Sequence, residues 1–94
     1  MNFKGKTAVI TGASVGIGRA VALLLAEGGA NLVLTDINYE GLEKVKEEAE
    51  KFGVEALICK CDVSDEKTVN SVVQEAINHF GKTDILVNNA AIWR

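Results

Sequence analysis

The sequence predicts an α/β domain in which a parallel sheet is covered by helices on both faces. Two observations support this fold class. Short apolar segments rich in Val, Ile and Leu alternate with longer segments of helical periodicity, and glycines separate many of these segments. Because right-handed crossovers join strands that alternate with helices of this length, the strands are expected to run parallel. A chain of 94 residues without proline is expected to form one small domain.

The amino-terminal half contains two strand–helix units. Strands are expected over residues 6–12 and 31–36, and helices over residues 17–27 and 39–52. Apolar residues in both helices repeat at intervals of three and four, so they are expected to face the sheet. They are Ile17, Ala20, Val21, Leu24 and Leu25 in the first helix, and Leu42, Val45, Ala49 and Phe52 in the second.

The carboxy-terminal half repeats the pattern. Strands are expected over residues 54–61 and 83–88, and Ser64 is a suitable N-cap for the helix between them. The apolar positions of that helix are Val69, Val72, Val73, Ala76, Ile77 and Phe80. The resulting order β-α-β-α-β-α-β predicts a doubly wound sheet with strand order 3-2-1-4. Right-handed crossovers then place the first two helices on one face and the third helix on the other.

Composition narrows the possible partners. The net charge of −3 argues against nucleic-acid binding, and no apolar run is long enough to cross a membrane. The amino terminus lacks the apolar region of a signal peptide, so a cytoplasmic location is expected. Cys59 and Cys61 are two residues apart on a predicted strand and are expected to be buried free thiols on one face.

Glycines cluster at the turn between the first strand and the first helix. Gly12 suits a tight turn, Gly16 leaves room for a phosphate, and Gly18 allows the helix to pack closely on the strand. Amide groups at the start of a helix favour an anion. A P-loop is excluded, because Arg19 and Ala20 occupy the positions where Lys and Ser or Thr would be required.

An acidic residue ends the second predicted strand. Asp36 lies 18 residues beyond Gly18, a spacing typical of a carboxylate that accepts hydrogen bonds from the adenosine ribose. Its charge would repel a 2′-phosphate, and Ile37 and Asn38 follow it without a neighbouring cation. These features favour NAD over NADP. The alternative interpretation is that Asp36 caps the next helix.

Polar residues also follow the third and fourth predicted strands. Asp62 and Val63 come after the third strand, and Asn88, Asn89, Ala90 and Ala91 come at the end of the fourth. Because parallel strands end at one edge of the sheet, these residues are expected to form a single site with the glycine turn.

The segment TGASVGIG, Asp36, the Cys61-Asp62-Val63 step and the Asn88–Ala91 step together resemble the short-chain dehydrogenase/reductase family, over the whole chain. The resemblance implies a Rossmann-type fold and NAD as cofactor. It implies that Gly12, Ser14, Ile17 and Gly18 surround the pyrophosphate and that Gly16 shapes the turn. Asp36 would hold the ribose. Asp62 would bind the adenine amino group with Val63 beside the ring, and Asn89 and Ala90 would lie near the nicotinamide ribose. Asn88 would tie the central strands together.

The resemblance also implies a catalytic Ser, and a Tyr with a Lys four positions later, downstream of the asparagines. The only tyrosine here is Tyr39, and Glu43 stands four positions after it, so no catalytic residue is assigned and residues 1–94 alone are expected to be inactive. We interpret residues 1–94 as a single NAD-binding half-domain of an oxidoreductase, truncated after the fourth strand. A stand-alone nucleotide-binding module and a methyltransferase fragment are the alternatives. The unpaired edge of the fourth strand predicts either a homo-oligomer or coverage by the remainder of a longer chain.

Overall fold

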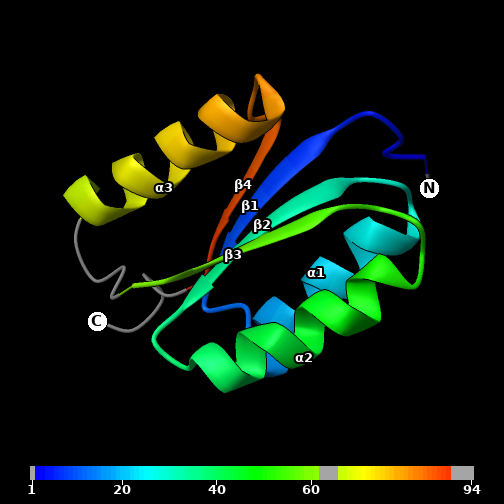
Figure 1. Ribbon diagram of the computed structural model, residues 1–94, viewed down its shortest axis with the longest axis horizontal. Helices are drawn as coiled ribbons and strands as arrows, with labels where there is room; N and C mark the ends of the chain where they lie inside the picture. Colours follow the sequence, from blue (N-terminus) through cyan, green and yellow to red (C-terminus); the bar gives the residue numbers. More distant parts are fainter. Residues whose placement is uncertain (1, 62–65, 90–94) are drawn as a thin grey trace.

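Four parallel strands form one sheet in the computed structural model, which describes residues 2–61 and 66–89. The strand order is β3-β2-β1-β4, as predicted (Figure 1). The elements in chain order are β1 (Thr7–Thr11), α1 (Gly16–Glu27), β2 (Asn31–Asp36), α2 (Tyr39–Glu50), β3 (Ala56–Lys60), α3 (Glu66–Phe80) and β4 (Ile85–Asn88). All seven predicted elements are therefore present, most of them shorter at their ends than the sequence suggested.

The helices divide between the two faces of the sheet as the crossover rule predicts. Helices α1 and α2 lie on one face and α3 lies on the other (Figure 1). Ile10 and Leu34 are fully buried on the face covered by α1 and α2. Val9 and Val33, their neighbours in sequence, are fully buried against α3. Strands apolar on both faces require this double cover.

The face of α1 that packs on the sheet differs from the prediction. Its buried residues are Gly18, Ala22, Leu25 and Ala26, whereas the side chains predicted to lead the apolar face are exposed, Ile17 by 68% and Leu24 by 55%. Three of the four buried residues have one side-chain carbon or none, so the helix backbone can lie close to the strands. The larger residues remain on the outer side, and of the predicted set only Leu25 is fully inside.

The other two helices follow the prediction more closely. The buried residues of α2 are Leu42, Val45 and Ala49, as predicted. Phe52 is 50% exposed because α2 ends at Glu50. In α3 the buried residues are Val69, Val72 and Ala76, whereas Ile77 is 39% exposed.

The two cysteines lie on the α3 side of the sheet, as expected from their spacing. Both are half-buried rather than buried. Burial raises the pKa of the Cys59 thiol, and negative charge on Cys61 or Glu75 would raise it further, so the protonated thiol is favoured. The Cys61 Sγ lies 2.8 Å from the Thr35 hydroxyl oxygen.

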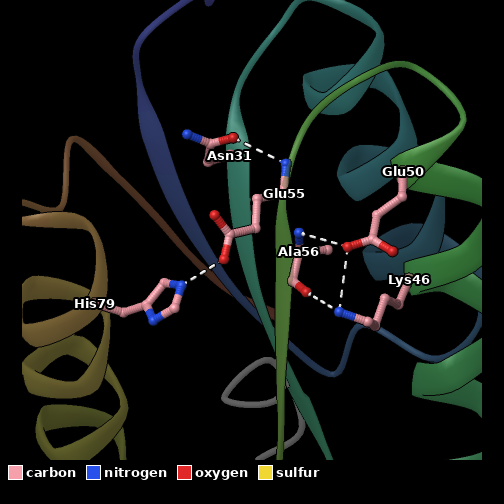
Figure 2. Close-up of polar contacts among 6 residues, drawn as sticks. All are labelled: Asn31, Lys46, Glu50, Glu55, Ala56 and His79. Carbon is pink, nitrogen blue, oxygen red and sulfur yellow. Dashed lines mark hydrogen bonds and ion pairs between the residues drawn. The ribbon is translucent and has the colours of Figure 1, made fainter.

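Side chains from β2 and α2 hold the start of the edge strand β3 (Figure 2). The Glu55 amide donates to the Asn31 Oδ1 at 3.0 Å, and the Ala56 amide donates to the Glu50 Oε2 at 3.4 Å. Lys46 pairs with Glu50 and also donates to the Ala56 carbonyl oxygen at 2.5 Å. Backbone groups that would otherwise lack partners at the beginning of the strand are thereby satisfied.

The residue just before β3, Glu55, also contacts α3 on the other face of the sheet. The His79 Nε2 lies 2.5 Å from the Glu55 Oε2 (Figure 2). Both side chains are substantially exposed, so this contact adds little stability and mainly orients the chain between α2 and β3. Within the residues that the structure describes, no helix is long and apolar enough to span a membrane.

Strand β4 is fixed to β1 by a reciprocal contact just before it begins. The Thr7 amide donates to the Asp84 Oδ2 at 2.9 Å, and the Asp84 amide donates to the Thr7 carbonyl oxygen at 2.9 Å. The hydrogen bond from Thr7 lowers the pKa of the Asp84 carboxyl, with a further contribution from Lys82. The ionised form is therefore favoured in the folded state.

We predict that Asp84→Asn destabilises the protein at pH 7 and that this difference from wild type shrinks at acid pH. A carboxyl whose pKa is lowered by folding stabilises above its ordinary pKa, about 3.9, and loses that contribution as the pH falls through the folded value. Urea unfolding at pH 7 and at about pH 3 measures the effect, with Glu43→Gln as the control for loss of one negative charge. A destabilisation that is equal at both pH values would contradict the prediction.

Candidate functional site

The ends of β1, β2 and β4 bring the predicted site residues to the carboxyl edge of the sheet. The Ala13 amide donates to the Thr35 carbonyl oxygen at 3.2 Å, which holds the turn after β1 against β2. The Asn89 Nδ2 donates to the Gly12 carbonyl oxygen at 3.3 Å, which joins the same turn to the end of β4. Of the ten predicted residues, Asp62, Val63 and Ala90 lie outside the described residues.

Gly12 and Gly16 occupy backbone conformations that favour glycine. Their φ angles are +61° and +58°, in the left-handed region. A Cβ on Gly16 would meet no atom within 4 Å, so the space beside this turn is open. The turn geometry proposed for these two glycines from the sequence is therefore present.

Gly18 is needed for a different reason, which is the closeness of α1 to the end of β1. A Cβ built on Gly18 would lie 2.1 Å from the Gly12 carbonyl oxygen and 3.1 Å from the Asn89 Nδ2. No side chain fits in that gap. The close packing of helix on strand predicted for Gly18 is confirmed.

Among the residues that the structure describes, no side chain caps the amino terminus of α1 or offsets the positive end of its dipole. Val15 occupies the N-cap position with an extended φ of −145°, and its side chain accepts no hydrogen bond. The first turn of α1 contains no acidic residue. The positive end of the helix dipole therefore faces the open space beside Gly16, where an anion would be stabilised. Ile17, at the start of the helix, is mostly exposed.

Hydrogen bonds from two neighbouring loops hold the Asp36 carboxylate. Its Oδ2 accepts from the Ser14 hydroxyl at 2.6 Å and from the Ser14 amide at 3.2 Å, while its Oδ1 accepts from the Asn38 amide at 3.3 Å. Partial burial tends to raise the pKa of Asp36, but these bonds and one from the Ile37 amide outweigh it and lower the pKa. Asp36 is therefore a fixed negative charge at neutral pH.

The alternative in which Asp36 itself caps α2 is wrong. Asn38 is the N-cap, and its Oδ1 accepts from the Gly41 amide at 3.1 Å. Asn38 was not identified as a cap from the sequence. Asparagine directly before the first residue of a helix is, however, a recognisable N-cap signal. Asp36 instead accepts from the amide of this N-cap residue and from Ser14.

Two further contacts organise the site. The Thr11 hydroxyl donates to the Asn88 Oδ1 at 3.0 Å, which links the ends of β1 and β4 as the resemblance implied for Asn88. Arg19, the cation nearest the glycine turn in sequence, binds both carboxylate oxygens of Glu48 on α2 at 3.2 and 2.6 Å. Among the described residues, no Lys or Arg forms an ion pair with Asp36.

A cleft of about 490 Å³ opens between the start of α1 and the length of α2. Ser14, Val15, Arg19, Asn38, Gly41 and Lys44 are among the residues that line it. Among the described residues, the lining includes Ser14 and Val15 of the turn but not Asp36 or the three glycines.

Comparison with known proteins gives consistent matches. A family model described as short chain dehydrogenase matches residues 6–94. The 7alpha-hydroxysteroid dehydrogenase of Escherichia coli K12 is 41% identical over 90 residues, which are 96% of this chain and 35% of that protein. The L-rhamnose 1-dehydrogenase (NADP(+)) of Thermoplasma acidophilum is 47% identical over 93 residues, 98% of this chain and 37% of that protein.

A solved structure extends the match to three dimensions. The structure titled as 7 alpha-hydroxysteroid dehydrogenase complexed with NADH and 7-oxo glycochenodeoxycholic acid has a TM-score of 0.85 and 40% identity. The match covers 93% of this chain and 34% of that one. The chain thus spans about a third of the length of the relatives it matches.

We predict that Gly18→Ala destabilises the protein by about 3 kcal/mol, because the added methyl group would overlap a backbone carbonyl that cannot turn aside. Gly16→Ala is the matched control in the same turn. It carries only the cost of a left-handed conformation, about 1–2 kcal/mol, because the space around it is open. Chemical unfolding of both variants measures the difference, and equal destabilisation would contradict the close approach of α1 to β1.

Proposed function

The chain belongs to the short-chain dehydrogenase family, and we propose that it forms the NAD(H)-binding half of an oxidoreductase acting on an alcohol or ketone substrate. The observation that carries this proposal is the Asp36 carboxylate, which Ser14 and Asn38 hold beside the glycine turn. A fixed acceptor at the end of β2 suits the two hydroxyl donors of an adenosine ribose. When bound, the nicotinamide ring supplies or accepts the hydride.

The glycine turn fits the pyrophosphate. Gly12, Ser14, Ile17 and Gly18 surround this group in the proposal, and Gly16 keeps the approach open. The uncapped amino terminus of α1 and the empty space at Gly16 support this assignment. The Ser14 hydroxyl donates its single hydrogen to Asp36, so this hydroxyl does not also donate to the pyrophosphate. In the proposal, Ser14 lies beside the pyrophosphate because of its position in the loop.

The remaining assignments concern the two ends of the cofactor. Asp62 and Val63 bind the adenine in the proposal, and Asn89 and Ala90 lie beside the nicotinamide ribose. Support comes from Asn89, whose amide nitrogen donates to the Gly12 carbonyl oxygen and so places β4 beside the turn. Asn88 supports the same arrangement through its contact with Thr11.

The proposal favours NAD over NADP although one relative is named for NADP(+). The lowered pKa of Asp36 keeps the carboxylate charged at the place where a 2′-phosphate would lie. Arg19, the cation nearest the glycine turn in sequence, is engaged by Glu48. A 2′-phosphate would therefore meet the Asp36 carboxylate, with which no Lys or Arg of the described residues forms an ion pair.

Residues 1–94 form the cofactor half in this proposal, and the substrate and the catalytic residues belong to the whole protein. Tyr39 is the only tyrosine of the chain and begins α2 beside the ribose-binding end of β2. The residue four positions later is Glu43, where the resemblance implies a lysine after the catalytic tyrosine. Tyr39 is therefore assigned no catalytic role.

We predict that the protein binds NAD(H) about ten- to a hundredfold more tightly than NADP(H), because the 2′-phosphate faces a like charge. Asp36→Ala removes that charge and brings the two affinities together. Titration calorimetry with both cofactors measures the ratio. An NADP(H) preference in the wild-type protein, or a ratio that Asp36→Ala leaves unchanged, would sink the assignment of Asp36.

The outer edge of β4 is the proposed contact with a second copy or with the remainder of a longer chain. In the part of the chain that the structure describes, β4 pairs only with β1, and Leu86 is 48% exposed on the α3 side. An unpaired edge beside apolar surface favours association. We predict that residues 1–94 alone form a homodimer or larger assembly at micromolar concentrations. Analytical ultracentrifugation tests this, and a folded, soluble monomer would show it to be wrong.

A further inference from the structure

Gly41 in the first turn of α2 has no conformational reason to be glycine. It lies within a regular α-helix and is not among the glycines with positive φ. Glycine inside a helix is less favourable than alanine, so its presence calls for another cause. That cause is visible in its surroundings, because a Cβ on Gly41 would lie 2.7 Å from the Ser14 Cβ and 2.8 Å from the Asn38 Nδ2.

The two residues that crowd Gly41 are the two that hold Asp36. Ser14 donates both its hydroxyl and its amide to the Asp36 carboxylate, and the Asn38 amide donates to the other oxygen. Ser14 is only 6% exposed, so it is enclosed rather than free to swing away from α2. Gly41 is itself fixed, because its amide donates to the Asn38 Oδ1.

We propose that Gly41 is a positioning residue for cofactor recognition: its missing side chain lets the loop after β1 seat Ser14 against α2, where Ser14 holds the Asp36 carboxylate. This inference rests on the proposed binding of NAD(H) through Asp36. A methyl group at position 41 displaces the loop, because the Ser14 Cβ is attached to backbone and cannot rotate out of the contact. The displaced Ser14 then releases one oxygen of Asp36.

The proposal predicts a specific effect of Gly41→Ala. NADH binding weakens about tenfold, because hydrogen bonds to a charged group are lost and the carboxylate is no longer held in place. NADPH binding changes by less than about threefold, because a released carboxylate can turn away from a 2′-phosphate. The ratio of the two affinities therefore falls, which a general loss of stability would not produce.

The test is a double-mutant cycle with Ser14→Gly, read as the NADH and NADPH dissociation constants of the purified protein. Ser14→Gly removes the Cβ that meets position 41 and leaves the Asn38 side chain as the remaining close neighbour, so Gly41→Ala should have a clearly smaller effect in that background. Ser14→Ala keeps the Cβ and removes only the hydroxyl, which separates the hydrogen bond from the steric contact. Glu43→Ala, at an exposed position of the same helix, is the matched control and should leave both constants unchanged.

The outcomes separate this inference from the proposed function. If NADH binding depends on Asp36 but is unchanged by Gly41→Ala, only the role of Gly41 is overturned. The same holds if Gly41→Ala has an equal effect with and without Ser14→Gly. If the wild-type protein binds NADPH as tightly as NADH, both the proposed function and this inference are wrong. If Gly41→Ala fails to fold, recovery of folding in the Ser14→Gly double variant, with NADH binding equal to that of Ser14→Gly alone, supports the contact, and failure of the double variant to fold overturns it.

Discussion

Helix α1 can lie against the end of β1 only because no side chain stands between the Gly12 carbonyl and the α carbon of Gly18. The Cβ of any other residue at position 18 would lie 2.1 Å from that carbonyl oxygen. This approach brings the amino terminus of α1 to the carboxyl edge of the sheet, with its positive end open to an anion. The Asn89 amide reaches the same carbonyl, so β4 is placed relative to the same point. The geometry of the site therefore depends on this one close contact.

The second element of the site is electrostatic. A carboxylate at the end of a strand tends to be partly buried, and burial alone would favour its neutral form. Here the hydrogen bonds from Ser14 and Asn38 outweigh that effect and keep Asp36 charged. The bonds come from the loop after β1 and the start of α2, so the charge is fixed relative to the glycine turn as well as to its own strand. In the proposed function, this link is what makes the chain favour NAD over NADP.

Much of this arrangement could be predicted from the sequence, because the patterns concerned are local. The alternation of strands and helices gave the sheet order and the division of helices between faces, and the spacing of Gly12, Gly16 and Gly18 indicated the turn. The face of α1 could not be chosen correctly, since Ile17 and Leu24 have the same helical spacing as the small residues that are buried. Hydrophobicity favours the larger set, whereas the contact at Gly18 requires the smaller one. The contacts of Ser14 with Asp36 and with Gly41 join residues distant in sequence, so no local pattern could reveal them.

A crystal structure of the protein with NADH bound tests the central claim most directly. We expect an oxygen of the Asp36 carboxylate within hydrogen-bonding distance of the adenosine ribose hydroxyls, with the Ser14 hydroxyl still bound to the same carboxylate. The pyrophosphate should lie at the amino terminus of α1, beside Gly16. A cofactor whose ribose is held elsewhere, or a carboxylate that has left Ser14 to meet it, would contradict the account.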